Sequence, residues 1–307
     1  MPRTSSAPSR RTLLLGGAGA VALGAAGLIV GVESGRLPGR VLLDRALDRG
    51  DVQVGAPSGP AGDVAYSTFA SRARGGPVAW GLSVPPGVSA RGLPVVLVLH
   101  GRGRDAHAAF DLLAMHRFVA AHVRSGGAPL AVVSVDGGSD TYWHPRESGG
   151  DPLVMITDEL VPRLADAGLH TASIAVTGWS MGGYGALLMA RESSAGRLGG
   201  LRVAAASAAS PALFATYAAS APGAFDSAAD WARWGALARR PGVTGVPLQV
   251  SCGTSDPFAD QTRVYRSHCR PAPAGGLSAG RHDGGYWRSL VPGQLRFVAG
   301  HLAAVRS

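Results

Sequence analysis

The stretch Ser173-Ile174-Ala175-Val176-Thr177-Gly178-Trp179-Ser180-Met181-Gly182 sets a G-x-S-x-G pentapeptide between an apolar run, 173–177, and a helical pattern, 181–192. A short apolar run before a turn is typical of a buried strand. When a strand, a tight turn and a helix follow one another in this way, the central serine is strained. Its neighbours at i−2 and i+2 must be small because the strand and the helix approach closely there. The stretch therefore predicts an α/β fold whose turn presents Ser180 as a nucleophile.

Short apolar runs alternate with longer helical patterns from residue 63 to the end of the chain. This alternation is typical of a mostly parallel sheet with helices on both faces, and no internal repeat interrupts it, so we expect one domain. The expected strands are 64–69, 77–84, 94–99, 130–135, 173–177, 202–208 and 246–252, the first two as an antiparallel pair. The expected helices are 106–124, 153–167, 181–192, 259–268 and 286–302.

The composition excludes several classes of protein. The 307 residues are 46% hydrophobic and 16% charged, too apolar for a disordered chain. All 29 basic residues are Arg, and Lys and Asn are absent, which excludes a Schiff-base lysine, a P-loop lysine and Asn-linked glycosylation. Residues 1–50 contribute +4 of the net charge of +9, from seven Arg and three acidic residues, and the other Arg are scattered. We therefore expect no nucleic-acid partner.

Residues 1–32 have the pattern of a targeting segment. Residues 1–12 are basic, and 13–32 are almost wholly Leu, Ala, Gly and Val. The motif Ser9-Arg10-Arg11-Thr12-Leu13-Leu14 resembles the twin-arginine export signal. The alternative is a permanent membrane anchor, because about 20 apolar residues can span a bilayer. We expect export to the cell envelope or the exterior, with release or a membrane tether through 13–32, then a linker or N-terminal arm over 33–62 and an α/β-hydrolase domain over 63–307.

A serine hydroxyl needs a base to accept its proton, so Ser180 predicts an acid and then a histidine later in the chain. Asp256 lies in the loop after the expected strand 246–252, where this fold delivers the acid, whereas Asp260 is already on a helix. Asp256 is also a candidate N-cap of that helix, and the two roles are compatible. Asp256 is therefore the predicted acid.

Three histidines follow Asp256. His282 lies in the Gly-rich loop Gly280-Arg281-His282-Asp283-Gly284-Gly285, where an imidazole can reach the nucleophile. His268 is at a helix end and His301 is within the last helix, so we expect surface or packing roles for them. His282 is the predicted base.

Backbone N–H groups are expected to bind the oxyanion that forms when Ser180 attacks a carbonyl. One is that of Met181, and the second comes from the loop His100-Gly101-Arg102-Gly103-Arg104-Asp105, where Arg102 is the candidate. The Arg102 side chain either helps to hold an acidic group of the substrate or is solvated, and the sequence leaves both open.

Three aromatic residues are predicted to contact the substrate: Trp179 within the pentapeptide, and Tyr142 and Trp143 in the loop after the expected strand 130–135. The alternative for Tyr142 and Trp143 is packing beneath the segment 209–241. That segment departs from the alternation of strands and helices and is expected to be either a partial cap over the site or ordinary surface helix.

Neither a metal site nor a disulfide is expected. The histidines His100, His107 and His144 do not form an H-E-x-x-H or comparable motif, so we predict no metal and no cofactor. Cys252 is expected at the end of a strand and Cys269 at the far end of the helix that follows, roughly 15 Å away along the helix axis, whereas a disulfide needs Cα atoms within about 7 Å.

These residues resemble a known family. The stretch Gly178-Trp179-Ser180-Met181-Gly182-Gly183-Tyr184-Gly185-Ala186-Leu187 is similar to the nucleophile segment of α/β-hydrolase-fold serine esterases of the esterase D type. This group includes S-formylglutathione hydrolases, feruloyl esterases and mycobacterial mycolyltransferases. A subset of exported actinobacterial esterases is similar at His100-Gly101-Arg102-Gly103, Tyr142-Trp143-His144-Pro145, residues 253–258, His282 and Tyr286-Trp287.

The resemblance runs from about residue 63 to the end of the chain. It implies a triad of Ser180, Asp256 and His282, no cofactor, and ester hydrolysis or acyl transfer. We therefore predict an exported, monomeric serine esterase acting on a small-molecule, lipid or sugar ester. The alternatives are an acyltransferase acting on cell-envelope sugars or lipids, like the mycolyltransferases, and a catalytically inert envelope-binding module on the same scaffold.

Overall fold

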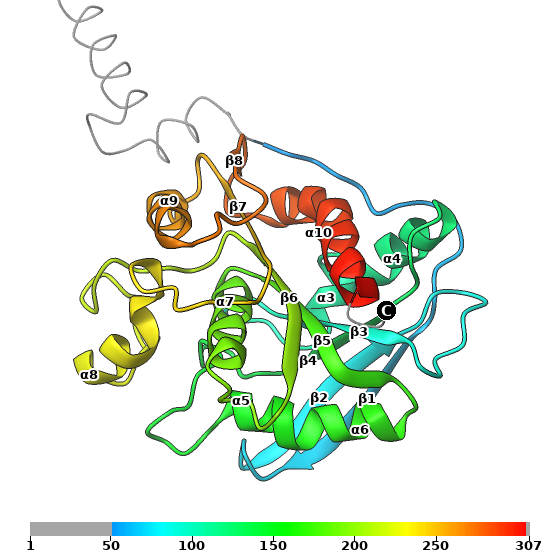
Figure 1. The fold of residues 1–307 in the computed structure, drawn as a ribbon, viewed down its shortest axis with the longest axis horizontal. Helices are drawn as coiled ribbons and strands as arrows, with labels where there is room; N and C mark the ends of the chain where they lie inside the picture. The colour runs from blue at the N-terminus through cyan, green and yellow to red at the C-terminus, as the bar shows by residue number, and fades with distance from the viewer. Residues whose placement is uncertain (1–50, 305–307) are drawn as a thin grey trace, which may run out of the picture. The chain divides into compact units, whose positions relative to one another are not determined.

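The computed structural model describes residues 51–304 (Figure 1). Their centre is an eight-stranded sheet in the order β1-β2-β4-β3-β5-β6-β7-β8. β1 pairs antiparallel with β2, β2 pairs antiparallel with β4, and all the other pairs are parallel. The strands are β1 (Val64–Ser71), β2 (Gly76–Ser83), β3 (Pro94–Leu99), β4 (Ala131–Val135), β5 (His170–Trp179), β6 (Arg202–Ala209), β7 (Leu248–Gly253) and β8 (Leu277–Ser278).

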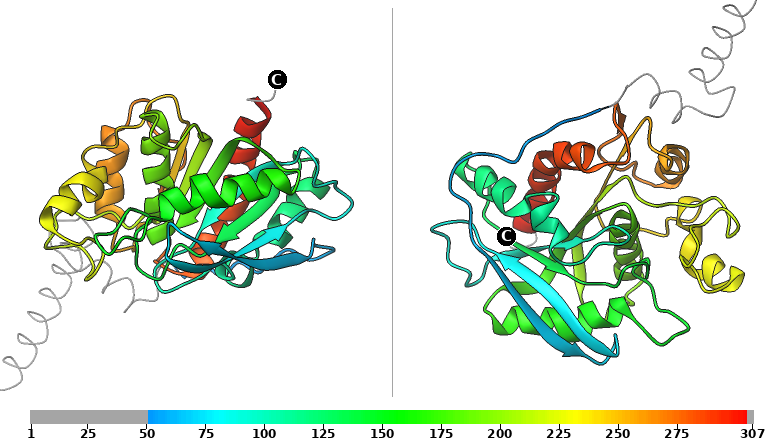
Figure 2. Two further views of the ribbon diagram at one scale, coloured as in Figure 1. Left: turned by 90° about the horizontal axis from the view of Figure 1, so that it is seen from below. Right: turned by 180° about the vertical axis from the view of Figure 1, so that it is seen from behind.

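Helices cover both faces of the sheet, as the alternating pattern predicts. Figure 2 shows the β1–β2 pair at one edge and α9 near the other. The helical segments are α3 (Ala108–Asp111), α4 (Met115–Arg124), α5 (Pro152–Val154), the π-helix η1 (Met155–Leu160), α6 (Val161–Asp166), α7 (Met181–Ser194), α8 (Ala228–Asp230), the π-helix η2 (Trp231–Gly235), the 3₁₀-helix η3 (Ala236–Ala238), α9 (Ala259–His268) and α10 (Gly284–Ala304).

The central strand β3 is buried on both faces. Val95, Leu97 and Leu99 belong to one hydrophobic core, which includes residues of α7 and η1. Val96 and Val98 belong to the other core, which includes residues of α4 and α10. Successive side chains of a strand point to opposite faces, so a continuous apolar run between two helical layers buries every residue. This confirms the α/β architecture expected from the sequence.

Two of the expected helices are interrupted. The expected helix 106–124 is divided into α3 and α4, because Ala114 takes a left-handed conformation with φ 54°. The expected helix 153–167 becomes α5, η1 and α6 in succession. Pro162 in α6 has no N–H to donate to the preceding turn, and a π-type segment precedes it. The prediction of one regular helix was wrong in both places.

The segment 209–241, here called the insertion, was expected to depart from the alternation of strands and helices. Its helical parts are short: α8, η2 and η3. Its Phe214 ring packs edge-on against Phe258, which in turn packs against His282. The insertion therefore lies beside the loop that bears His282, so the prediction of a small insertion near the site is confirmed.

The first described residues form an extended arm along the domain. The Arg124 guanidinium donates to the Ser58 carbonyl oxygen at 2.9 Å, and Val52 packs against the core of α4 and α10. Within residues 51–304 we find no helix that is both long and apolar enough to cross a membrane. The expected targeting segment, 1–32, and most of the linker expected to follow it lie outside the described residues.

Candidate active site

Ser180 occupies the turn between β5 and α7. Its φ of 55° and ψ of −120° are uncommon for a residue with a side chain, and conformations of this kind persist where the surrounding structure fixes them. Three backbone hydrogen bonds do so here: the Ser180 N–H donates to the Ala209 oxygen, and the N–H groups of Tyr184 and Ala212 donate to the Ser180 oxygen, each at 3.0 Å. The turn therefore presents the partly exposed Ser180 side chain at the carboxyl end of the sheet.

The glycines around Ser180 are required by close backbone contacts. A Cβ on Gly178 would lie 2.3 Å from the carbonyl oxygen of Gly182, and a Cβ on Gly182 would lie 1.9 Å from that of Leu99. A Cβ on Gly183 would lie 2.9 Å from the Ala209 oxygen. The strand and helix backbones therefore lie as close together as the pentapeptide predicts.

The structure brings the predicted nucleophile, base and acid together. The Ser180 hydroxyl donates to His282 Nε2 at 2.9 Å, and His282 Nδ1 donates to Asp256 Oδ2 at 2.8 Å. The Asp256 side chain is fully buried and also accepts the Phe258 N–H at 2.9 Å, whereas the His282 side chain is 24% exposed. The imidazole lies edge-to-face with Phe258 and Trp287. These contacts set the ring between the serine and the carboxylate.

Strand β8 holds the histidine loop to the acid loop, and the sequence did not predict it. The Thr254 N–H donates to the Ser278 oxygen at 2.8 Å, and the Ser255 N–H donates to the Gly280 oxygen at 3.0 Å. Because β8 has two residues, no hydrophobic pattern could have indicated it. Its pairing with β7 fixes the spacing between Asp256 and His282.

The backbone around Ser180 offers two N–H groups for an oxyanion. Met181 is the first residue of α7, and the first N–H groups of a helix have no acceptor within it. Arg102 follows Gly101, and a Cβ on Gly101 would lie 3.5 Å from Ser180 Cβ. Among the described residues the Arg102 N–H has no hydrogen-bond acceptor. Both predicted donors therefore lie on segments next to the nucleophile.

His100 holds the loop that contains Arg102. Its Nε2 accepts the Gly137 N–H at 3.0 Å, so Nδ1 bears the proton and donates to the Gly101 oxygen at 2.9 Å. The side chain is fully buried. The sequence placed His100 in the loop expected to supply the second oxyanion donor, but it did not indicate the bond to Gly137. That bond joins the loops after β3 and β4, whose proximity depends on the order of the strands in the sheet.

The three aromatic residues predicted to contact substrate are all buried in the core. Tyr142 packs against Phe225 of the insertion, and the Trp143 indole N–H donates to the His100 carbonyl oxygen at 3.4 Å. Tyr142 and Trp143 have positive φ, and both are at most 2% exposed, as is Trp179. For Tyr142 and Trp143 these contacts correspond to the packing alternative, and substrate contact by the three rings stays a prediction.

The Arg102 side chain contacts the insertion. Its Nη2 donates to the Pro222 carbonyl oxygen at 2.9 Å. The loop after β3 and the segment after β6 are thereby joined at the rim of the site.

A thiol and a phenol lie near Asp256. Burial, together with the charge of Asp256, raises the pKa of Cys252 to about 12. Burial likewise raises the pKa of Tyr286 to about 12, and its hydroxyl is 3.1 Å from Ser278 Oγ. Cys252 and Cys269 are both buried free thiols. Within 51–304 there is no group of three or more His, Cys, Asp or Glu side chains suited to a metal ion.

A mostly parallel sheet with a serine on a strand-turn-helix junction and a hydrogen-bonded His and Asp at its carboxyl end defines the α/β-hydrolase fold. Residues 71–297 match the model of the Esterase family, whose description is "Putative esterase", and the chain belongs to this family. It is accordingly a carboxylic ester hydrolase.

Solved structures agree with this fold. A ferulic acid esterase superposes with a TM-score of 0.66 at 18% identity, covering 79% of this chain and 100% of its own. An S-formylglutathione hydrolase from Agrobacterium tumefaciens gives 0.62 at 17% identity, covering 82% and 100%. FphF, a fluorophosphonate-binding serine hydrolase of Staphylococcus aureus, gives 0.61 at 17% identity, covering 78% and 99%. The search of curated protein sequences returned no match.

Proposed function

We propose that the protein is an exported serine esterase in which Ser180 is the nucleophile, His282 the base and Asp256 the acid. The observation that supports this most directly is the pair of hydrogen bonds, 2.9 and 2.8 Å long, from Ser180 through His282 to Asp256. A serine hydroxyl is a weak nucleophile until an adjacent base accepts its proton, and a base is effective when a third group orients it. Membership of the Esterase family supports the same chemistry.

In the proposed acylation, Ser180 Oγ bonds to the ester carbonyl carbon while its proton moves to His282 Nε2. Asp256 stabilises the imidazolium that forms, and the N–H groups of Met181 and Arg102 bind the oxyanion. Collapse of the tetrahedral intermediate breaks the bond to the alkoxy group. The alcohol departs with the proton from His282, and the acyl group stays on Ser180 Oγ.

In the proposed deacylation, a water oxygen bonds to the acyl carbon and gives one proton to His282. The second tetrahedral intermediate releases the carboxylic acid, and the proton returns to Ser180 Oγ. His282 is suited to both steps because its side chain is partly exposed, so water can reach it. An alcohol in place of the water would make the reaction an acyl transfer.

We propose a small-molecule carboxylic ester as the substrate. The names of the structural neighbours, a ferulic acid esterase and an S-formylglutathione hydrolase, support this substrate class.

The sequence of residues 1–32 supports export of the protein. The substitution R10K/R11K in the full-length protein should therefore keep the protein in the cytoplasm. Secretion of that variant at the wild-type level would contradict the twin-arginine route.

Turnover of p-nitrophenyl esters of graded acyl length tests the proposal, with and without trehalose as an acyl acceptor. The wild type should release p-nitrophenol, and S180A, H282A and D256A should each lose activity by about 10³-fold or more. A trehalose ester among the products would favour the acyltransferase alternative. A folded S180A variant that retains activity would refute the assignment of the nucleophile, and an inactive wild type would favour a binding module.

A further inference from the structure

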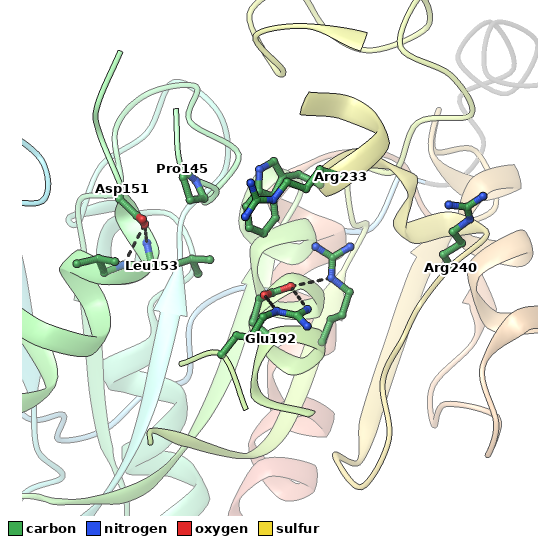
Figure 3. Close-up of a pocket in the computed structure, with 10 residues that line it drawn as sticks. Pro145, Asp151, Leu153, Glu192, Arg233 and Arg240 are labelled. Atoms are coloured by element: carbon green, nitrogen blue, oxygen red, sulfur yellow. Dashed lines mark hydrogen bonds and ion pairs between the residues drawn. The ribbon is translucent and has the colours of Figure 1, made fainter. Parts of the chain in front are cut away.

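A cavity of about 640 Å³ lies at the C-terminal end of α7. Ser180 precedes α7 and Arg191 is in its last turn, eleven residues later, which corresponds to about 16 Å along a helix. The cavity is therefore separate from the ester site. Figure 3 shows residues of α5, α7 and η2 around it, and its lining consists of Pro145, Asp151, Leu153, Val154, Arg191, Glu192, Arg197, Arg233, Trp234 and Arg240.

The lining has an excess of positive charge. Four arginines and two carboxylates line the cavity, which gives the lining a net charge of +2. One of the carboxylates, Asp151, is already engaged, because its Oδ1 accepts the N–H groups of Leu153 and Val154 at the start of α5. Among residues 51–304, Glu192 is the one carboxylate that forms ion pairs with the arginines of the cavity.

Glu192 orients two of the guanidinium groups. Its carboxylate, 4% exposed, accepts Arg191 Nε at 2.9 Å and both Nε and Nη2 of Arg197 at 2.6 and 3.0 Å (Figure 3). Burial alone would raise the pKa of Glu192, but the hydrogen bonds and charges of Arg197 and Arg191 outweigh it and hold the pKa below its ordinary value. A buried carboxylate that pairs with two arginines fixes the orientation of their planar guanidinium groups. The N–H groups that the carboxylate does not use are then free to bind a ligand.

The two other arginines are not neutralised within the domain. Among residues 51–304 the guanidinium groups of Arg233 and Arg240 form no ion pair and no hydrogen bond. Arg233 lies over the Trp234 ring, 4.6 Å from its centroid, and Arg191 is 5.7 Å from the same centroid. The indole thus supports guanidinium groups from two elements at one wall of the cavity.

These features indicate the chemistry of a ligand. The +2 excess matches a phosphomonoester, which has a charge of about −1.5 to −2 at pH 7 and oxygen atoms that fit guanidinium forks. The cavity is larger than a phosphate group and has the size of a small-molecule site. The apolar residues Pro145, Leu153 and Val154 on its walls leave space for an organic part.

We propose that this cavity binds the phosphate group of a small phosphomonoester, with Arg191, Arg197 and Arg233 around the phosphate and Arg240 further out on the lining. Free phosphate shares this chemistry, and the two sources are distinguished by experiment. The site is independent of the ester chemistry at Ser180.

The test is thermal unfolding of the folded protein at pH 7.5 in increasing inorganic phosphate or glucose 6-phosphate, against NaCl at the same ionic strength. The variants are R233Q/R240Q, which breaks no ion pair of the described chain, and R91Q, a control that removes an exposed arginine outside the cavity. The wild type and R91Q should show a saturable rise in Tm that NaCl does not reproduce. R233Q/R240Q should need about tenfold more ligand for the same rise, and its ester turnover should equal that of the wild type.

A response to glucose 6-phosphate at lower concentration than to inorganic phosphate would support an organic phosphomonoester, and equal responses would support free phosphate. The proposal is overturned if neither compound raises Tm beyond NaCl, or if R233Q/R240Q responds as the wild type does.

Discussion

His100 Nδ1 donates a hydrogen bond to the carbonyl oxygen of Gly101, 2.9 Å away. This oxygen and the N–H of Arg102 belong to the same planar trans peptide and point in opposite directions. Fixing the oxygen therefore orients the N–H that we expect to bind the oxyanion. His100 Nε2 accepts a hydrogen bond from the Gly137 N–H, and this keeps the imidazole in the tautomer that can donate through Nδ1.

His100→Ala should therefore reduce kcat by about 10- to 100-fold with a small change in KM, because the lost interaction acts on the transition state. His100→Asn should restore part of kcat, since its amide can donate from a position near that of Nδ1. Steady-state kinetics with p-nitrophenyl acetate measures both variants. An unchanged kcat in a folded His100→Ala variant would contradict a positioning role.

Gly182→Ala should lower Tm strongly and abolish ester turnover. The added Cβ would lie 1.9 Å from the Leu99 carbonyl oxygen, so the strand and helix beside Ser180 must separate. Gly300→Ala is the matched control, because it lies in α10 and its Cβ would meet nothing within 4 Å. That substitution should stabilise the protein by about 0.4–1 kcal/mol. Equal Tm changes in the two variants would show that the close approach at Gly182 is absent.

Glu192 should make the free energy of unfolding depend on pH under acidic conditions. Its pKa in the folded state lies below the ordinary value of 4.5, because the contacts with Arg197 and Arg191 outweigh burial. The stability from these ion pairs is therefore complete above about pH 4.5 and is lost as the pH falls through the folded-state pKa. Glu192→Gln should lower the free energy of unfolding by about 1–3 kcal/mol at pH 7.

Urea denaturation between pH 3 and 7 tests this dependence. The difference in the free energy of unfolding between the wild type and Glu192→Gln should become smaller below about pH 4.5. Protonation of Glu192 in the wild type removes the negative charge that the variant lacks. A difference that is constant over the whole range would contradict the account.

Cys252 and Cys269 should not react with thiol reagents in the native protein. The thiolate is the reactive form, and burial raises the pKa of both thiols, that of Cys252 to about 12. Ellman's reagent at pH 8 should detect no thiol before unfolding and two thiols per chain in guanidinium chloride. Absence of thiols in the unfolded, unreduced protein would reveal a disulfide.

Much of the sheet and the candidate triad could be predicted from the sequence because the signals are local. Apolar runs locate the buried strands, and the pentapeptide requires small residues wherever the backbones of β5, α7 and β3 meet. Parallel strands end at the same edge of a sheet, so Asp256 after β7 and Ser180 after β5 are expected near each other. The order of these elements along the chain then indicates His282.

The remaining features depend on tertiary contacts. Ala114 has no local property that indicates a left-handed conformation, and β8 is too short to have a pattern. The burial of Tyr142 follows from packing against the insertion, whose path the sequence does not indicate. The role of His100 depends on the adjacency of β3 and β4, because the bond from the Gly137 N–H to its Nε2 joins the loops that follow these strands.

Labelling with a fluorophosphonate, followed by intact-mass and peptide analysis, tests the central claim most directly. The reagent reports a serine whose proton is accepted by a neighbouring base, so it measures the activation of Ser180 by His282. We predict one label per molecule, located on Ser180, with none on S180A and much slower labelling of H282A. Labelling of S180A at the wild-type rate, or a label on a different residue of the wild type, would contradict the account.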